Sequence, residues 1–555
     1  MTDYTVGDLV AEFLAAAGIE TGFGIVSVHN IPMLDAIARR NSLRFVPSRH
    51  EGGAGHMADA YARAHDGLGL VVTSTGPGAA NVTGALVEAR FASSPVLHLT
   101  GQTATGDLDR GHGSVHDVPD QLGMLASVSK TAYRVRSADE ALTVLSRAAA
   151  DALSPPMGPV SVEIPIDVQR TAIARPEALD DLDLPTAAPS VGDAASLDRM
   201  AEALAEARRP LLWCGTGARR AGTAVERLAA LGIPIVTSVN GRAVLAETHA
   251  MNLGAFAAVP RMEAFYASVD LMLVAGGRLR GHETRDLTLA LPERRMQIDV
   301  DPAAEGRTYE CEHFHLGECG AVLDALADRL EGRRQPDPAW TGEIAELKAA
   351  IQSDYRDTLG PYRDFPAILR EAIPADALWV RDITLNNSTW GNRLFPLAEP
   401  GANIYPVGAA IGPGLSLGIG AAFAPGGRKS VVMTGDGGFA MHLSELWTAV
   451  QQNADVTVLV MNDAGYGVIK HIQTQMYGDR QHFADLMSPP LEQVAALAGM
   501  PYFVVRSSDG LGAAVRDAVA VPGPSLVEVD MQAIGAFPPY FAPPPYARDA
   551  DEASA

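Results

Sequence analysis

The sequence predicts an α/β protein made of three doubly wound, parallel-sheet domains. Short apolar runs of strand length alternate with amphipathic stretches of helical length through most of the 555 residues. Such alternation is typical of parallel sheets with helices on both faces. Two polar stretches that contain proline, 172–193 and 331–337, interrupt the alternation and indicate linkers. We therefore expect three domains and a proline-rich C-terminal tail, over residues 1–175, 190–335, 345–535 and 536–555.

In the first block, amphipathic stretches predict helices over Val6–Ala17 and Gly52–His65. Short apolar runs predict its strands, over Gly22–Ile25, Leu70–Ser74, Pro95–Thr100 and Val160–Ile166. In the second block the apolar runs predict four more strands, over Pro210–Cys214, Ile233–Val239, Leu271–Ala275 and Met296–Val300.

The second block contains part of a dinucleotide-binding pattern. Gly215-Thr216-Gly217 follows its first predicted strand, but Arg220 stands where the third glycine of that pattern belongs. The sequence therefore argues against NAD binding in this block.

The functional argument depends on the third block. Val431–Thr434 predicts a buried strand, Gly435–Gly438 a turn that a ligand approaches closely, and Ser444–Gln452 a helix. Val456–Met461 then predicts a second strand. Further apolar runs predict two more strands, over Leu378–Val380 and Ser525–Val529.

The tail contains a proline-rich run, Phe537–Pro545. Such a run cannot form a helix or pair in a sheet. The tail is therefore either disordered or an extended arm over a neighbouring surface.

Two acidic residues end the two strands of the strand–helix–strand unit in the third block. Parallel strands bring their carboxyl ends to one edge of the sheet, so we expect Asp436 and Asp463 to lie close together although 27 residues separate them. Two oxygen ligands beside glycine amides and a helix N-terminus suit a hard divalent cation that holds a diphosphate. The alternative is an ordinary strand turn with acids at a solvated edge.

The Gly-Asp-Gly turn, the spacing, and Asn462-Asp463 followed by Ala464-Gly465-Tyr466-Gly467 resemble the signature of thiamine-diphosphate (ThDP) enzymes. The resemblance implies that Asp436 and Asp463 bind Mg²⁺ through their side chains and Gly465 through its carbonyl. It also implies cofactor contacts from residues at both strand ends: Gly435, Gly437, Gly438, Tyr466 and Gly467. The family often has Asn at the second ligand position, so Asp463 adds a negative charge to the site.

In their order, the three blocks resemble the pyrimidine-binding, middle and diphosphate-binding domains of ThDP-dependent decarboxylases and acetolactate synthases. By this resemblance Glu51 is the catalytic glutamate that hydrogen-bonds the pyrimidine ring; taken alone, it is an acid favoured at a helix N-terminus. Gly76, Pro77 and Asn81 resemble a cofactor-binding Gly-Pro-Gly turn, which is otherwise a plain strand-to-helix turn. Ile411 resembles the apolar residue that bends the cofactor; by itself it would be assigned to the core.

His29 and His116 are candidates for proton transfer. Both lie in loops that resemble pocket-lining loops of benzaldehyde lyase and decarboxylase relatives. The alternative is a surface role, because a lone loop histidine is more often exposed. The residues around His29 depart from the usual Pro-Gly turn of the family.

Cys311, His313, His315 and Cys319 have the spacing of a metal cluster, since alternate residues on a strand share a face. The stretch nevertheless resembles the ordinary end of the middle domain. The sequence therefore disfavours zinc there.

The resemblance implies ThDP- and Mg²⁺-dependent decarboxylation of a 2-oxo acid through a thiazolium enamine. Within the family, the chain most resembles 5-guanidino-2-oxopentanoate decarboxylase. Acetolactate synthase-type carboligation or 2-hydroxyketone cleavage is the alternative. Two further alternatives are a flavin-linked 2-oxo acid oxidase and a ThDP-binding module without catalytic activity. The sequence pattern that follows the second metal ligand in acetolactate synthases is missing here. This absence disfavours FAD in the middle domain. The remaining alternative is FAD as an inherited structural ligand. Val468, Ile469 and Ile472 predict a largely apolar substrate pocket.

A net charge of −23 argues against nucleic acid and against an anionic membrane surface as partners. The first residues lack the basic and apolar segments of a signal peptide, and glycines and Pro413 interrupt the longest weakly polar run, Gly408–Phe423. Three cysteines favour a reducing compartment. We expect a cytoplasmic homodimer or homotetramer whose active sites lie at subunit interfaces, as in relatives, with a small 2-oxo acid or hydroxyketone as ligand.

Overall fold

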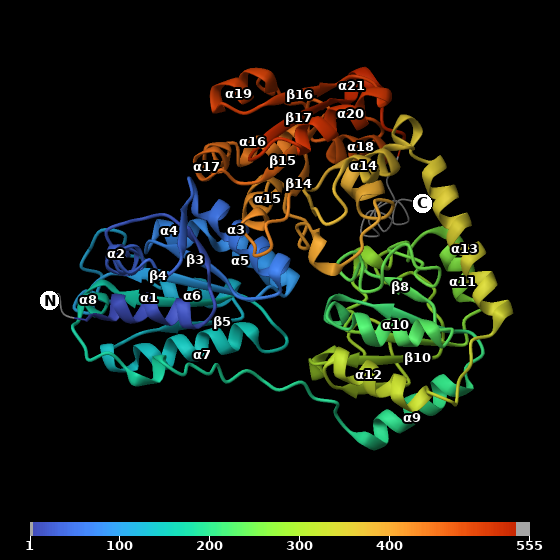
Figure 1. Ribbon diagram of the computed structural model, residues 1–555, viewed down its shortest axis with the longest axis horizontal. Helices are drawn as coiled ribbons and strands as arrows, with labels where there is room; N and C mark the ends of the chain where they lie inside the picture. Colours follow the sequence, from blue (N-terminus) through green and yellow to red (C-terminus); the bar gives the residue numbers. More distant parts are fainter. Residues whose placement is uncertain (1–3, 540–555) are drawn as a thin grey trace.

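A computed structural model describes residues 4–539 and folds them into three parallel β-sheets with helices on both faces (Figure 1). The strand orders are β2-β1-β3-β4-β6-β5, β11-β10-β9-β7-β8 and β13-β12-β14-β15-β17-β16. All neighbouring strands in these sheets run parallel. The predicted fold class is confirmed.

The bounds of the elements follow the chain through the three domains. The first sheet has β1 (Thr21–Gly24), β2 (Arg44–Pro47), β3 (Gly69–Thr73), β4 (Val96–Gln102), β5 (Thr131–Arg134) and β6 (Val160–Pro165). Its helices are α1 (Val6–Ala16), α2 (Ile31–Arg40), α3 (Glu51–His65), α4 (Pro77–Asn81), α5 (Thr83–Ala92), α6 (Gln121–Val128), α7 (Ala141–Leu153) and α8 (Ile166–Arg170). The middle sheet has β7 (Pro210–Cys214), β8 (Ile235–Thr237), β9 (Leu271–Ala275), β10 (Arg295–Asp299) and β11 (His313–Leu316), with α9 (Ala194–Glu206), α10 (Gly222–Ala230), α11 (Pro260–Tyr266) and α12 (Cys319–Leu330).

A long helix, α13 (Pro338–Asp357), leads into the third domain (Figure 1). The third sheet has β12 (Leu378–Arg381), β13 (Asn403–Ile404), β14 (Ser430–Gly435), β15 (Val456–Asn462), β16 (Tyr502–Val505) and β17 (Ser525–Asp530). Its helices are α14 (Phe365–Ala372), α15 (Gly414–Ala422), α16 (Asp436–Met441), α17 (Glu445–Gln452), α18 (Gly467–Met476), α19 (Leu491–Ala498), α20 (Ser508–Val519) and α21 (Met531–Ile534).

Five strands are not predicted from the sequence: β2, β5, β11, β13 and β16. Each of them is an edge strand of its sheet. An edge strand has fewer covered positions than a central strand. The residues of β5 are all only partly buried, whereas every residue of β4 is buried. β5 therefore lacks the continuous apolar run that marks a buried parallel strand.

The first and third domains meet along α3 and α15. A Cβ added to Gly420 of α15 would lie 2.1 Å from the carbonyl oxygen of Met57 in α3, so the two helix backbones approach closely only because this residue is glycine. This contact fixes the start of α3, and therefore Glu51, relative to the third domain of the same chain.

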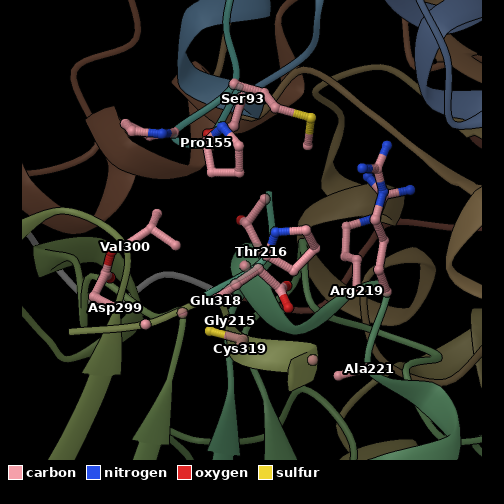
Figure 2. Close-up of a pocket in the computed structure, with 18 of the residues that line it drawn as sticks. Ser93, Pro155, Gly215, Thr216, Arg219, Ala221, Asp299, Val300, Glu318 and Cys319 are labelled. Atoms are coloured by element: carbon pink, nitrogen blue, oxygen red, sulfur yellow. The ribbon is translucent and has the colours of Figure 1, made fainter. Parts of the chain in front are cut away.

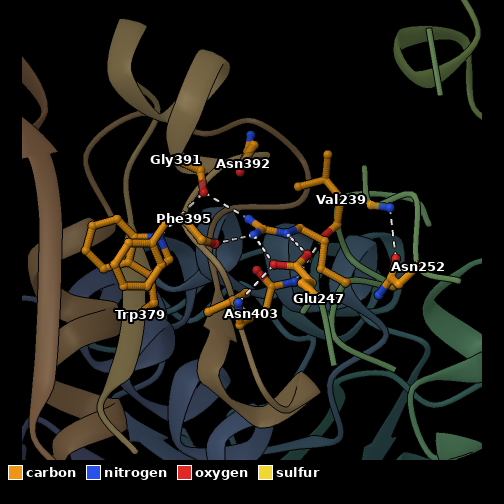
Figure 3. Close-up of polar contacts among 12 residues, drawn as sticks. Val239, Glu247, Asn252, Trp379, Gly391, Asn392, Phe395 and Asn403 are labelled. Atoms are coloured by element: carbon orange, nitrogen blue, oxygen red, sulfur yellow. Dashed lines mark hydrogen bonds and ion pairs between the residues drawn. The ribbon is translucent and has the colours of Figure 1, made fainter. Parts of the chain in front are cut away.

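A buried arginine of the middle domain, paired with a glutamate of the same domain, links the middle and third domains (Figure 3). Arg242 is fully buried and makes two hydrogen bonds of 2.6 Å with the carboxylate of Glu247. It also donates to the carbonyl oxygens of Gly391 at 2.9 Å and Phe395 at 2.6 Å in the third domain. The charge of Arg242 is therefore satisfied across the domain boundary.

Replacing Arg242 with Met is expected to lower the free energy of unfolding by about 3–5 kcal/mol, because the carboxylate of Glu247 is then left buried without its partner. Chemical denaturation followed by circular dichroism measures this change. Arg261, which pairs with Asp354 at the surface, is the control. Its replacement with Met is expected to cost less than about 1 kcal/mol; an equal loss in both variants would contradict the account.

The second predicted linker and the start of the tail are both packed. Arg334 is buried and donates to the carbonyl oxygens of Leu204, Ala207 and Leu231, so this linker is anchored to the middle domain. Phe537 stacks on Tyr362 with ring centroids 4.9 Å apart. The rest of the predicted proline-rich tail, residues 540–555, lies outside the described residues. Among residues 4–539, no helix has both the length and the apolar character needed to cross a membrane.

Candidate active site

The ends of β14 and β15 carry the two predicted metal ligands. The two strands are neighbours, with Gly435 paired to Met461. Asp436 is the first residue of α16 and is 1% exposed, and Asp463 directly follows β15. The structure therefore brings Asp436 and Asp463 together at the carboxyl edge of the third sheet.

The electrostatics of these two carboxylates suit a cation. Burial, and then the adjacent charge of Asp436, raise the pKa of Asp463 to about 7, while Lys470 opposes the rise. One oxygen of Asp436 accepts a hydrogen bond of 2.7 Å from Ser488. The other, Oδ1, is buried without a hydrogen-bond partner among the described residues. Two close carboxylates and an unpartnered oxygen fit a divalent cation such as Mg²⁺.

A cavity of about 200 Å³ lies beside Asp463. It is lined by predicted cofactor residues from three loops: Ile411, Gly435, Gly437, Gly438, Gly465, Tyr466 and Gly467. Val468 and Ile469 also line it, as predicted for an apolar pocket, but Ile472 does not. Ile472 lies one turn further along α18, so the prediction for this residue is wrong.

Three glycines of this cavity lie too close to other protein atoms to carry a side chain. A Cβ on Gly437 would lie 2.7 Å from the ring of Tyr466, and one on Gly467 would lie 1.9 Å from Oδ2 of Asp463. A Cβ on Gly438 would lie 2.9 Å from Oδ2 of Asp382. The turn is thus a backbone cradle at a helix N-terminus, which fits a diphosphate.

Asp382 is a site residue that the sequence analysis misses. It follows β12, is fully buried, and accepts hydrogen bonds of 3.0 Å from the amides of Gly412 and Gly414. Burial raises its pKa to about 6. Asp382 therefore ties the loop of Ile411 to the sheet edge. The strand-end rule that identifies Asp436 would also have found it.

Glu51 is the first residue of α3 in the first domain. Its Oε2 accepts a hydrogen bond of 3.0 Å from the side chain of Asn81. Its Oε1 would lie 3.2 Å from a Cβ on Gly78, so the Gly-Pro-Gly turn of Gly76 and Pro77 lies against this carboxylate. The structure therefore groups the predicted catalytic acid with the predicted cofactor-binding turn.

The two candidate histidines also lie together. The rings of His29 and His116 are 5.3 Å apart. Burial, and then the neighbouring His116, lower the pKa of His29. The carbonyl of His116 would be 2.3 Å from a Cβ on Gly76, whose φ is +60°, so the pair lies beside the Gly-Pro-Gly turn. None of these first-domain residues lines the cavity beside Asp463.

A second cavity, of about 1360 Å³, separates the first and middle domains (Figure 2). It lies over the carboxyl ends of the middle strands, where FAD would be expected. Glu318 caps α12 by accepting a hydrogen bond of 2.8 Å from an amide of the first turn, and Asp299 lies at the end of β10. Arg219 and Arg220 are engaged with Pro400 and Asp66. The acids at the start of α12 disfavour a diphosphate at that helix, although Arg278 and Arg280 also line the cavity.

The Cys/His stretch does not form a metal cluster. His313 and His315 do share a face of β11, but both contact the hydroxyl oxygen of Ser196 at 2.8 Å. Cys319 begins α12, with its sulfur 3.9 Å from a backbone carbonyl. Within residues 4–539, no group of three or more His, Cys, Asp or Glu side chains is arranged to hold a metal ion.

Comparison with known proteins identifies the class that this fold and site define. Residues 4–124 match the N-terminal TPP binding domain of thiamine pyrophosphate enzymes, residues 197–326 their central domain, and residues 385–529 their C-terminal TPP binding domain. The chain belongs to this family and is a ThDP-dependent enzyme. The predicted family and cofactor are thereby confirmed.

Individual relatives include both predicted reaction types. The probable 2-ketoarginine decarboxylase AruI of Pseudomonas aeruginosa is 31% identical over 92% of this chain and 89% of its own length. The large subunit of acetolactate synthase isozyme 1 of Escherichia coli is 27% identical, over 96% and 94%. A probable acetolactate synthase large subunit of Methanocaldococcus jannaschii is 28% identical, over 96% and 92%.

Proposed function

We propose that this enzyme is a Mg²⁺-dependent decarboxylase of 2-oxo acids. Asp436, Asp463 and the carbonyl of Gly465 would hold Mg²⁺, and the glycine turn would receive the diphosphate of ThDP. The unpartnered buried oxygen of Asp436 and the raised pKa of Asp463 support this assignment. Once bound, ThDP supplies a thiazolium that stabilises the carbanion left by the departing carboxylate.

In this proposal, residues of the first domain handle the protons. Glu51 would hold a proton for the pyrimidine ring, and Asn81 orients its carboxylate through the 3.0 Å hydrogen bond. Ile411, which lines the cavity, would pack against the two cofactor rings. One member of the His29–His116 pair would donate the single proton that the decarboxylated substrate needs to leave as an aldehyde. The pairing of these histidines is the observation that carries the choice of decarboxylation, because carboligation needs an acceptor carbonyl instead of a proton.

The substrate in this proposal has an uncharged, apolar side chain. Val468, Ile469 and other lining residues of the cavity are apolar, and Asp463 is its only carboxylate within the described part of the chain. Since Asp463 is assigned to the metal, the third domain offers no acid in this cavity to pair with a guanidinium group. The relative named as a 2-ketoarginine decarboxylase therefore suggests the reaction type rather than the substrate.

We further propose that the active enzyme is a homodimer or a dimer of dimers. All residues that line the cavity beside Asp463 come from the third domain, and Glu51 is outside it. Phe483 is 100% exposed and Met487 is 99% exposed. Both lie on the segment that contains Ser488, whose hydroxyl donates a hydrogen bond to Asp436. A second copy, which offers Val28 and Val115 beside its histidines, would cover these side chains and complete the site. The cytoplasmic location stays a prediction from the sequence.

A product analysis tests this function. The protein is incubated with ThDP, Mg²⁺ and a panel of 2-oxo acids with apolar, acidic and guanidino side chains, and CO₂ and organic products are measured together. We expect CO₂ and aldehyde in equal amounts, fastest with an apolar side chain. Hydroxyketone as the main product would favour the carboligase that the acetolactate synthase relatives suggest, and peroxide would favour an oxidase.

The pKa of Asp463 gives the pH dependence of metal binding. Because it is raised to about 7 in the metal-free protein, the carboxyl carries a proton below that pH, and Mg²⁺ must displace it. We expect the apparent dissociation constant for Mg²⁺ to rise as the pH falls from about 8 to about 6, approaching one proton released per ion. Titration calorimetry measures both quantities. Asp463→Asn is expected to remove this pH dependence; a slope that persists in that variant would contradict the assignment.

A further inference from the structure

Two buried glutamates lie where the first and third domains of one chain meet. Glu445 is the first residue of α17 in the third domain and is fully buried, and Glu88 lies in α5 of the first domain and is 4% exposed. Burial raises the pKa of both carboxyls. A buried carboxylate costs stability unless it is well hydrogen-bonded, so the partners of these two acids indicate what they do.

Glu445 holds the backbone directly before Glu51. Its Oε1 accepts hydrogen bonds from the amides of Arg49 at 3.1 Å and His50 at 3.0 Å, and its Oε2 accepts a longer one of 3.3 Å from the amide of Arg49. Its Oε2 accepts a hydrogen bond of 2.5 Å from the hydroxyl of Thr448, one turn along α17. The third domain thus fixes the turn from which the catalytic acid of the first domain projects.

Glu88 holds the backbone directly before Ile411. Its Oε2 accepts a hydrogen bond of 2.7 Å from the amide of Gly408, and its Oε1 accepts one of 2.8 Å from the amide of Ala410. The first domain thus fixes the loop from which the ring-bending residue of the third domain projects. The arrangement is the reciprocal of the one at Glu445.

Both contacts need a glycine in the held segment. A Cβ on Gly53 would lie 2.6 Å from Oε1 of Glu445, and a Cβ on Gly408 would lie 2.7 Å from Oε1 of Glu88. In each case a side chain would displace the carboxylate. The two acids and the two glycines therefore fit as matched pairs.

We propose that Glu445 and Glu88 are positioning residues that set Glu51 and Ile411 for activation of the cofactor. The inference rests on the proposed function, because it assigns Glu51 and Ile411 their roles there. Paired amide hydrogen bonds fix a backbone segment within tenths of an ångström, and catalysis by a positioned group falls steeply with such displacements. Apolar packing would hold the two domains together without this restraint.

The rate of hydrogen–deuterium exchange at C2 of bound ThDP, measured by acid quench and proton NMR, reports activation directly. For Glu445 the expected results differ between two variants. Glu445→Ala removes both acceptors and is expected to slow exchange by about tenfold or more, with ThDP binding retained. Glu445→Gln can turn its carbonyl to the two amides and its NH₂ to the hydroxyl of Thr448, so exchange is expected within about threefold of wild type.

For Glu88 the conservative variant is expected to fail. Each of its oxygens faces a different amide, so Glu88→Gln places an NH₂ group against one N–H donor. We expect Glu88→Gln to slow exchange by about tenfold, nearly as much as Glu88→Ala. The contrast between the two Gln variants keeps the test decisive if either Ala variant folds poorly.

Asp455 supplies the control, because it also accepts a hydrogen bond from a backbone amide, that of Gly523 at 3.2 Å, but at the opposite edge of the third sheet. Asp455→Ala is expected to lower the melting temperature and to leave exchange unchanged. Exchange at the wild-type rate in Glu445→Ala, or equal rates in the two Gln variants, would overturn the inference. If Glu51→Gln itself exchanges at the wild-type rate, the proposed function fails instead.

Discussion

Glu51→Gln is expected to lower kcat by on the order of 10²- to 10⁴-fold while ThDP binding stays within about threefold of wild type. The amide is nearly the same size and can still accept the hydrogen bond from Asn81, so the turn keeps its shape. It cannot hold an acidic proton at the pyrimidine nitrogen. Steady-state kinetics at saturating Mg²⁺ and ThDP measure the loss, and the C2 exchange rate should fall in parallel.

Glu177 provides a matched control, because it is an exposed acid that also begins a helix. If Glu51 only stabilised the N-terminus of α3, both Glu→Gln variants would lose no more than about 1 kcal/mol of stability and no activity. Turnover by Glu51→Gln that matches the turnover of Glu177→Gln would leave a ThDP-binding protein whose reaction does not use this acid.

Asp436→Asn is expected to weaken the binding of Mg²⁺ and ThDP by on the order of 100-fold. The substitution removes one charge and replaces an oxygen at a position that is only 1% exposed. The stabilisation by bound ligand reports this loss, since it grows with the ratio of ligand concentration to dissociation constant. We expect ThDP and Mg²⁺ together to raise the melting temperature of the wild type and to leave that of Asp436→Asn unchanged.

Two variants test whether the effect is specific to Asp436 or follows from the removal of any acidic residue. Asp463→Asn introduces the residue that the family often carries and is expected to retain binding near neutral pH. Asp509→Asn changes an acid in the first turn of α20 in the same domain and is expected to bind as the wild type does. Full ligand stabilisation in Asp436→Asn would show that the metal is held elsewhere.

The two proposed metal ligands are predictable from the sequence because each one follows a parallel strand. Parallel strands bring their carboxyl ends to one edge, so Asp436 and Asp463 are placed by topology alone. The same argument applies to Asp382, which directly follows β12, a strand that the sequence predicts over Leu378–Val380. The edge strand β5 is not predicted from the sequence, because it lacks a continuous buried run.

The contacts between domains cannot be predicted in this way. Glu445 and His50 are 395 residues apart, and Glu88 and Gly408 are 320 apart. No periodicity relates such positions. The one local signal is that Glu88 is a charged residue within the otherwise apolar buried face of α5, which conflicts with amphipathic patterning and points to a specific partner. The pairing of His29 with His116 likewise arises from loops that only the folded first domain brings together.

The central claim is that one cofactor is held by Glu51 of one chain and by Asp436 and Asp463 of another. Co-expression of Glu51→Gln and Asp436→Asn chains with different tags yields hybrid dimers, each with one intact and one doubly altered site if the sites span two chains. Although each parent is nearly inactive, the purified hybrid is then expected to show about half of the wild-type activity per dimer. Hybrid activity no higher than that of the two parents would contradict the claim.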